Sequence, residues 1–295
     1  MAASDLNTKS NFHARSNSLP SRPHPLILQC NEHLERLKAS FETSSSSSML
    51  SHKLGGLQDL HECVEKLVQL PLTHEALLHE SQQNCVDELL DGSLRLLDVC
   101  TAAKDSLLHT KECMRELQSI MRRRKGGEEG IIVEAKKFLT SRKVVKKAIS
   151  KALGNLKDIA KKGNFSSNTK DQLALVGLLK DVEVVTLSIF ESLLKFICGS
   201  TQSKAGNWSL VSKLIHTKRI GCSQVVEESE FSQVDEALHS FVLHMTNKSS
   251  SNNIIDLPSH LEKLESRIQD FEEGLEFMFR RMIKIRVTLL NILNN

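Results

Sequence analysis

The chain has 295 residues, of which 40% are apolar and 25% are charged, and its 39 basic and 36 acidic side chains give a formal charge of +3. This length suits one large domain or two small ones and is sufficient to bury a sizeable core. The chain has five prolines, no tyrosine and one tryptophan, Trp208. This composition disfavours a turn-rich all-β fold, because such folds draw on aromatic and β-branched strands.

The cysteine pattern indicates a reducing environment. None of the seven cysteines forms a C-x-x-C pair, and Cys30 stands where a helix with Leu26 and Ile27 places an apolar side chain. We therefore expect reduced core cysteines. No apolar signal segment precedes them, and no stretch of about 20 residues is free enough of charge to span a membrane. The protein is expected to be intracellular, foremost cytoplasmic, with a peripheral membrane location and the chloroplast as alternatives, and not secreted.

The first 23 residues are polar and rich in serine and arginine, which predicts a disordered tail. Residues 24–295 then form a single predicted helical domain. A first helix begins at Pro25 and ends near Phe41, and a second covers residues 50–67 and stops before Pro71. Residues 84–124 continue the helical period without a proline, with Gly92 as the only weak point. About 40 helical residues would be roughly 60 Å long. An elongated bundle follows from that length.

A basic helix is predicted over residues 131–162, and a mostly apolar one, expected to be the most buried, over residues 169–198. In the latter, Lys180, Glu183, Glu191 and Lys195 share a narrower polar face. Shorter helices are expected at 208–218 and 230–245, and a long final helix at 258–293. Flexible linkers are expected near residues 43–49, 125–130, 199–206, 219–228 and 246–257. The fold class is therefore all-α: an elongated multi-helix bundle with long antiparallel helices and a disordered N-terminal tail.

Motifs for catalysis are missing from the sequence. His74 and His79 are five residues apart, whereas a helical zinc motif needs histidines four apart. Gly126, Gly127 and Gly130 lack the Gly-Lys-Ser/Thr ending of a phosphate loop. We expect no catalytic residue, no cofactor and no metal, and hence a non-enzymatic protein. An enzyme whose site assembles from distant residues stays as the third alternative.

Charge is segregated along the chain. Residues 121–162 hold 14 basic and 4 acidic side chains, whereas residues 59–100 hold 2 basic and 9 acidic ones. Opposed potentials of this kind favour antiparallel docking within the bundle or recruit separate partners. The basic region forms a predicted surface strip: Arg122, Arg123, Arg124, Lys125, Lys136, Lys137, Lys143, Lys147 and Lys151. A solvated face is its simplest interpretation. The alternatives are an anionic membrane or an acidic partner, while nucleic acid is disfavoured because stacking aromatics are missing.

Arg142 interrupts the apolar stripe of the same helix, close to its centre. Two arrangements fit this position. The arginine either extends its stem along the core with its guanidinium in water, or forms a buried pair with a carboxylate on the neighbouring helix, Asp181 or Glu183 being the candidates.

The tail carries a further candidate site. Arg15, Ser16, Ser18 and Pro20 fit the phosphoserine pattern R-S-x-S-x-P, which 14-3-3 proteins bind. Phosphorylated Ser18 would then recruit such a protein. The competing interpretation is structural, with Leu19 and Pro20 folding back onto the bundle.

Four stretches, distributed along nearly the whole chain, resemble the sequences of one protein family. They are residues 13–25, residues 70–73, residues 182–194 and residues 261–293, the last including Phe271-Glu272-Glu273-Gly274-Leu275-Glu276. This pattern resembles the plant-specific BYPASS-related proteins. The resemblance implies a helical protein linked to root and shoot development, without catalytic residues to transfer. We therefore expect a helical interaction or adaptor protein in plant developmental signalling, with peripheral membrane binding through residues 131–162 as the alternative. The oligomeric state stays open.

Overall fold

The computed structural model describes residues 24–41, 47–78, 83–123, 127–162, 174–199, 228–247 and 256–294, without the side chains of residues 47, 83–85, 157–162 and 247. Every regular element in these ranges is a helix, which confirms the all-α class. The helices are α1 (Pro25–Ser40), α2 (Ser47–Val68), α3 (Pro71–Leu78), α4 (Gln83–Arg123), α5 (Gly127–Lys162), α6 (Ala174–Cys198), α8 (Glu230–Asn247) and α9 (Leu257–Asn294).

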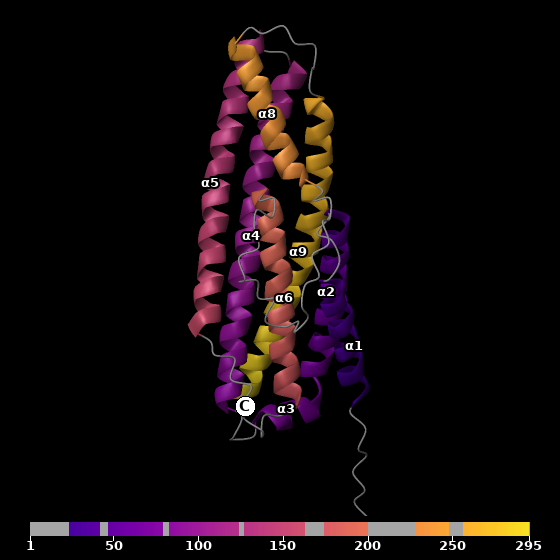
Figure 1. Ribbon diagram of the computed structural model, residues 1–295. Coiled ribbons are helices and arrows are strands. Elements are labelled where there is room, and N and C mark those ends of the chain that lie inside the picture. Colours follow the sequence, from indigo (N-terminus) through magenta and orange to yellow (C-terminus); the bar gives the residue numbers. More distant parts are fainter. Residues whose placement is uncertain are drawn as a thin grey trace, which may run out of the picture.

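Three long helices set the shape of the molecule. Helix α4 has 41 residues and α9 has 38, so each extends for about 60 Å. Figure 1 shows α4 running the length of an elongated bundle, with α5 and α9 antiparallel to it on either side. The predicted elongated bundle of long antiparallel helices is confirmed.

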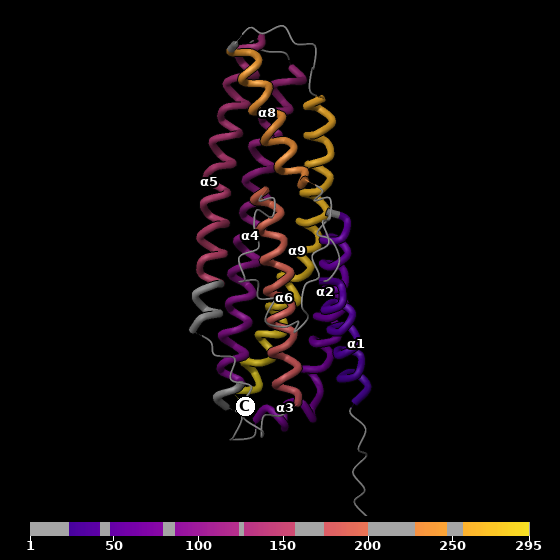
Figure 2. Tube along the Cα trace, viewed as in Figure 1, coloured from indigo at the N-terminus to yellow at the C-terminus, as the bar shows by residue number. Residues whose placement is uncertain are grey.

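The bundle consists of two four-helix sections stacked end to end. Helices α2, α4, α6 and α9 form the lower section of Figure 1, with α1 packed on α2 and α6, and helices α4, α5, α8 and α9 form the upper one. Helices α4 and α9 belong to both sections, and the lower part of α5 extends down beside α4 and α6. Helix α8 continues along the axis where α6 ends, as the Cα trace in Figure 2 shows. At the junction between α6 and α8, one helix takes over from the other at the same corner of the bundle.

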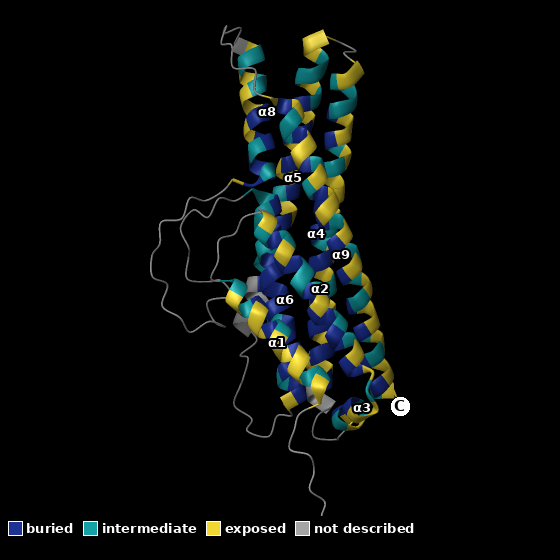
Figure 3. Ribbon diagram, turned by 90° about the vertical axis from the view of Figure 1, so that its right-hand side faces the viewer, coloured by how far each residue is buried: buried dark blue, intermediate teal, exposed yellow. Residues whose placement is uncertain are grey.

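Apolar stripes at helical spacing build one continuous core, which Figure 3 shows as the buried interior along the bundle axis. Helix α6 is buried on nearly every turn, as expected for the most apolar helix. Glu183 and Glu191 differ from the prediction of a polar face, because both are buried. Helices α1, α2, α4 and α5 pack around α6, and the two buried carboxylates compensate by pairing with Arg95 and Lys195.

Several predicted linker boundaries are wrong by a few residues. Helix α2 begins at Ser47, inside the predicted 43–49 linker, and α8 ends at Asn247, inside the predicted 246–257 linker, where α9 begins at Leu257. Helix α5 begins at Gly127, inside the glycine-rich 125–130 linker. Its first turn holds two glutamates, whose negative charge stabilises a helix N-terminus. The remaining linker residues, the 1–23 tail and the expected helix at 208–218 lie outside the described residues.

The cysteines are consistent with a reduced core. Cys30, Cys63 and Cys100 are buried free thiols, and Cys113 and Cys198 are half-buried free thiols. Burial raises the pKa of Cys100 to about 12, which keeps this thiol protonated. Within the described ranges, none of the helices is long and apolar enough to span a membrane.

Candidate interaction surface and the buried contacts that hold it

Helix α5 is amphipathic, and it lies on the outer flank of the bundle in Figure 1. Its inner side, which faces α4, α6 and α8, buries Phe138, Val145 and Ile149. The opposite side carries five exposed lysines, which we call the basic face: Lys136, Lys137, Lys143, Lys147 and Lys151. The structure thus brings these five predicted residues onto one surface.

Most of this positive charge is uncompensated. Lys137 is the exception, because its ammonium lies 2.5 Å from Glu116 on α4 and 3.3 Å from Glu134, and these carboxylates raise its pKa. Within the described residues, no carboxylate pairs with Lys136, Lys143, Lys147 or Lys151. Four cations over about four helical turns attract an anionic partner and lose this attraction in salt.

Two valines interrupt the basic face. Val133 is 65% exposed and Val144 is 59% exposed, although Val145 and Ile149 of the same helix are buried. Scattered exposed apolar residues need no special explanation, but these two lie on the same line as the lysines. The surface therefore offers both charge and a small apolar contact to a partner.

The arginine cluster contributes to this strip only in part. Arg122 and Arg123 are exposed in the last turn of α4, where cations stabilise the helix C-terminus. Arg124 and Lys125 lie outside the described residues. The described part of the strip is thus the end of α4 together with the basic face of α5.

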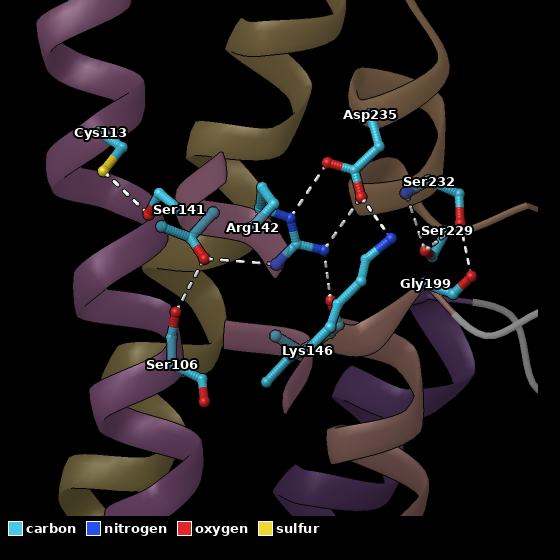
Figure 4. A network of polar contacts seen from close by, with 11 residues as sticks. Ser106, Cys113, Ser141, Arg142, Lys146, Gly199, Ser229, Ser232 and Asp235 are labelled. Carbon is cyan, nitrogen blue, oxygen red and sulfur yellow. Dashed lines mark hydrogen bonds and ion pairs between the residues drawn. The ribbon is translucent and has the colours of Figure 1, made fainter. Parts of the chain in front are cut away.

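Arg142 is held on the opposite side of α5, where it is 2% exposed (Figure 4). Its Nε donates to Asp235 Oδ1 at 3.1 Å, and its Nη2 donates to the Ile197 carbonyl at 2.7 Å. A longer bond of 3.4 Å reaches the Thr110 hydroxyl. The guanidinium also lies 5.2 Å from the centre of the Phe231 ring. Arg142 therefore connects α4, α5, α6 and α8 rather than reaching water.

The predicted partners of Arg142 are wrong. Glu183 accepts a hydrogen bond from Arg95 at 2.7 Å, and Asp181 pairs with Lys38 at 3.1 Å. Both carboxylates are in the lower half of α6, about 20 Å along the helix from Ile197, which is level with Arg142. The correct partner, Asp235, was missed although its signal is visible in the sequence: it lies on the apolar stripe of α8 beside Val234 and Leu238. An acid on one apolar stripe and a base on another are natural partners.

Asp235 serves two cations, because Lys146 lies 2.9 Å from its other oxygen. Lys146 is thereby turned from the basic face toward α8.

Next to this cluster, Gly199 has a φ of 70° and follows the last turn of α6, as a helix C-terminus favours. Its carbonyl accepts from Ser232 Oγ at 2.9 Å, while Ser229 Oγ caps α8 by accepting from the Ser232 amide at 3.2 Å. These contacts join the two sections of the bundle (Figure 4).

A second buried ion pair lies in the lower section. Glu183 is buried beside Arg95, and burial raises the pKa of its carboxyl despite the arginine. The carboxylate also lies against Gly92, where an added Cβ would clash with Glu183 Oε2. The glycine that weakens the predicted long helix therefore makes room for this carboxylate.

Within the described residues, no group of three or more His, Cys, Asp or Glu side chains is arranged to hold a metal ion. The phosphoserine motif at Arg15, Ser16, Ser18 and Pro20 lies outside the described residues, so its role stays a prediction from sequence.

A comparison with known families found a match over most of the chain. The family model described as Protein BPS1 matches residues 53–292. This match confirms the resemblance to BYPASS-related proteins that the sequence motifs indicated. No curated protein and no solved structure matches the chain.

Proposed function

Because the chain belongs to the BPS1 family, which suggests a role in plant development, we propose that it is a non-enzymatic interaction protein in developmental signalling of the root and shoot. Its basic face on α5 binds a negatively charged surface of a partner protein. The observation that carries the proposal is the set of four exposed lysines without a carboxylate partner among the described residues. A face that only keeps α5 in contact with water could equally well carry lysines paired with carboxylates. Unpaired lysines therefore favour binding to a partner.

The buried contacts support this use of α5. Arg142, Lys146 and Asp235 fix the helix to α8, so the basic face is held rigidly and loses little entropy when a partner docks. Reversal of Lys136, Lys143 and Lys147 to glutamate changes only exposed, unpaired side chains and should leave the fold intact. This triple variant, the α5 variant below, therefore separates binding from stability.

The test compares three proteins in plants that lack the endogenous one: the wild type, the α5 variant and a control. The control reverses Arg36, Lys66 and Lys263, which are exposed on α1, α2 and α9 and give the same change in net charge. Quantified affinity purification should show a partner set that the α5 variant loses and the control keeps, and only the α5 variant should fail to restore development. Full rescue by the α5 variant with an unchanged partner set would reject the proposal.

An anionic membrane surface is the second candidate, favoured by Val133 and Val144 among the lysines. It predicts binding of the purified protein to lipid vesicles without any protein partner, which a prediction in the Discussion tests.

A further inference from the structure

A second charged face lies on α4, on the side turned away from the core. It carries five carboxylates separated by four or seven residues, all of them exposed: Asp87, Asp91, Asp98, Asp105 and Glu112. None of the five forms an ion pair with a described lysine or arginine. We call this line of carboxylates the acidic face.

Apolar residues complete the same line. Leu94 is 47% exposed and Leu108 is 51% exposed, and with Thr101 between them they fill the gaps between the carboxylates. The result is an alternation of four- and three-residue steps from Asp87 to Glu112, which is the spacing of a coiled-coil seam. The core-facing side of α4 is already packed, by Leu96, Ala103 and Leu107 among others. Helix α4 therefore has two lines of this spacing: a core-facing one that packs inside the bundle, and this outer one.

The basic face of α5 has the same periodicity. Val133, Lys137, Thr140, Val144, Lys147 and Lys151 follow one another in steps of four and three residues. This seam rises about 27 Å along the helix, and the acidic one rises about 37 Å. Two outward seams of one spacing, comparable length and opposite charge are thus displayed on neighbouring helices.

Contacts within one molecule satisfy little of this charge. The only described ion pair between α4 and α5 joins Lys137, a member of the basic seam, to Glu116, which lies outside the acidic line. The five carboxylates and four lysines face solvent instead. Their complementarity is available to a second molecule.

We propose that this second molecule is another copy of the same chain, with the acidic face on α4 of one copy docked against the basic face on α5 of the next. The inference rests on the proposed function, whose basic face it uses, and it names the negatively charged partner. Since two different surfaces meet, the contact is heterologous and either closes into a ring or extends as a chain of copies. Docking places exposed leucines against exposed valines and opposite charges against each other.

Sedimentation velocity of the full chain tests the proposal, at about 50 mM and about 500 mM salt, because screening weakens contacts between exposed charges. We expect association at low salt that shifts toward monomer at high salt. The α5 variant and an α4 variant, in which Asp91, Asp98 and Asp105 are reversed to lysine, should each be monomeric. A control that reverses Glu75, Glu236 and Glu262 alters equally exposed, unpaired carboxylates and should associate like the wild type.

Complementation makes the test specific for the two faces. Mixing the α4 and α5 variants brings an acidic surface and a basic one together again, so the mixture should associate although neither variant does alone. A chain carrying both sets of reversals has exchanged its charges and should also associate. Circular dichroism of each variant should show unchanged helicity, which excludes unfolding as the cause of dissociation.

A wild-type chain that stays monomeric at about 50 mM salt and high protein concentration overturns the inference. The inference also fails if the α4 variant or the α5 variant alone associates as strongly as the wild type. If the wild type is monomeric while the α5 variant still loses its plant partners, this inference fails and the proposed function stands. If α5 reversal changes neither sedimentation nor the partner set, both fail.

Discussion

Arg142 on α5 and Asp235 on α8 form a buried ion pair, with Nε and Oδ1 separated by 3.1 Å, although the two residues are 93 positions apart in the chain. The same guanidinium binds the last turn of α6 through the Ile197 carbonyl. Both four-helix sections of the bundle therefore meet at one arginine. The basic face of α5 depends on this contact for its position, because Arg142 and Lys147 are on opposite sides of the same helix.

Loss of this arginine should destabilise the protein strongly. In Arg142→Leu, Asp235 keeps only the half-exposed Lys146, and the Ile197 carbonyl loses its partner. Removal of one member of a buried pair costs about 3–5 kcal/mol. Urea unfolding should show this loss, whereas Arg115→Leu, which alters an arginine that is 62% exposed, should change the free energy of unfolding by about 0.5 kcal/mol or less. Equal midpoints for the two variants would contradict the structural role of Arg142.

Gly92 should not tolerate alanine. In an open helix position, glycine to alanine is stabilising by about 1 kcal/mol. At Gly92 the added Cβ meets the buried carboxylate of Glu183 and disturbs its pair with Arg95, so we expect Gly92→Ala to destabilise by about 1 kcal/mol or more. Gly154 on α5 has no atom within 4 Å of an added Cβ. Gly154→Ala should therefore be stabilising, and opposite signs in thermal or urea unfolding would confirm the packing at Gly92.

His61 should make stability depend on pH. Its Nε2 donates to the Thr186 hydroxyl at 2.8 Å, because that hydroxyl itself donates to the Val182 carbonyl. Burial, assisted by the charge of Arg281, lowers the pKa of His61 from 6.5 to about 4. Above pH 6.5 the imidazole is neutral in both states and contributes no pH dependence. As the pH falls from 6.5 to 4, only the unfolded chain gains the proton, and stability decreases by an amount on the order of 3 kcal/mol.

The measurement is urea unfolding of the wild type and His61→Gln between pH 4 and 8. Carboxylates also titrate at the acidic end, so the informative quantity is the difference between the two pH profiles. The wild type should lose more stability than the variant between pH 6.5 and 4. Parallel profiles would show that His61 is protonated equally in the folded and unfolded states.

Vesicle binding separates the two candidate functions of the basic face. Attraction to an anionic membrane contributes about 1 kcal/mol per lysine near the surface. If the membrane is the partner, the wild type should float with phosphatidylserine-containing vesicles and not with pure phosphatidylcholine, and the α5 variant should stay in solution. Binding of the α5 variant equal to that of the wild type rejects the membrane function. The charge-matched control with reversed Arg36, Lys66 and Lys263 tests whether net charge alone is responsible.

The tail motif leads to a prediction that needs no structure. A phosphate on Ser18 adds a charge of about −1.5 to −2. Arginines in the phosphopeptide-binding site of the partner protein bind such a group through charge-assisted hydrogen bonds. Synthetic peptides covering residues 12–22, with and without phosphate on Ser18, should therefore differ in their affinity for a 14-3-3 protein. Equal or absent binding of both peptides would leave only the structural role for Leu19 and Pro20.

The sequence by itself determined the helices and the position of the charges. Apolar residues at three- and four-residue spacing gave α4, α5, α6 and α9 their approximate limits and gave α5 its lysine side, because both features depend only on neighbours along one helix. The sequence does not determine boundaries such as Gly127, since a glycine-rich linker and a helix start with glutamates in its first turn look alike locally.

Only the tertiary structure decided which buried charges meet. Arg142 was expected to pair with Asp181 or Glu183, yet it pairs with Asp235, because α8 rather than the lower half of α6 lies level with it. Likewise, Gly92 looked like a weak point of a long helix until Glu183 was found against it. Periodicity states which side of a helix faces inward. It does not predict where along the bundle axis each helix begins and ends. That axial position determines which buried charges lie level with one another and can pair.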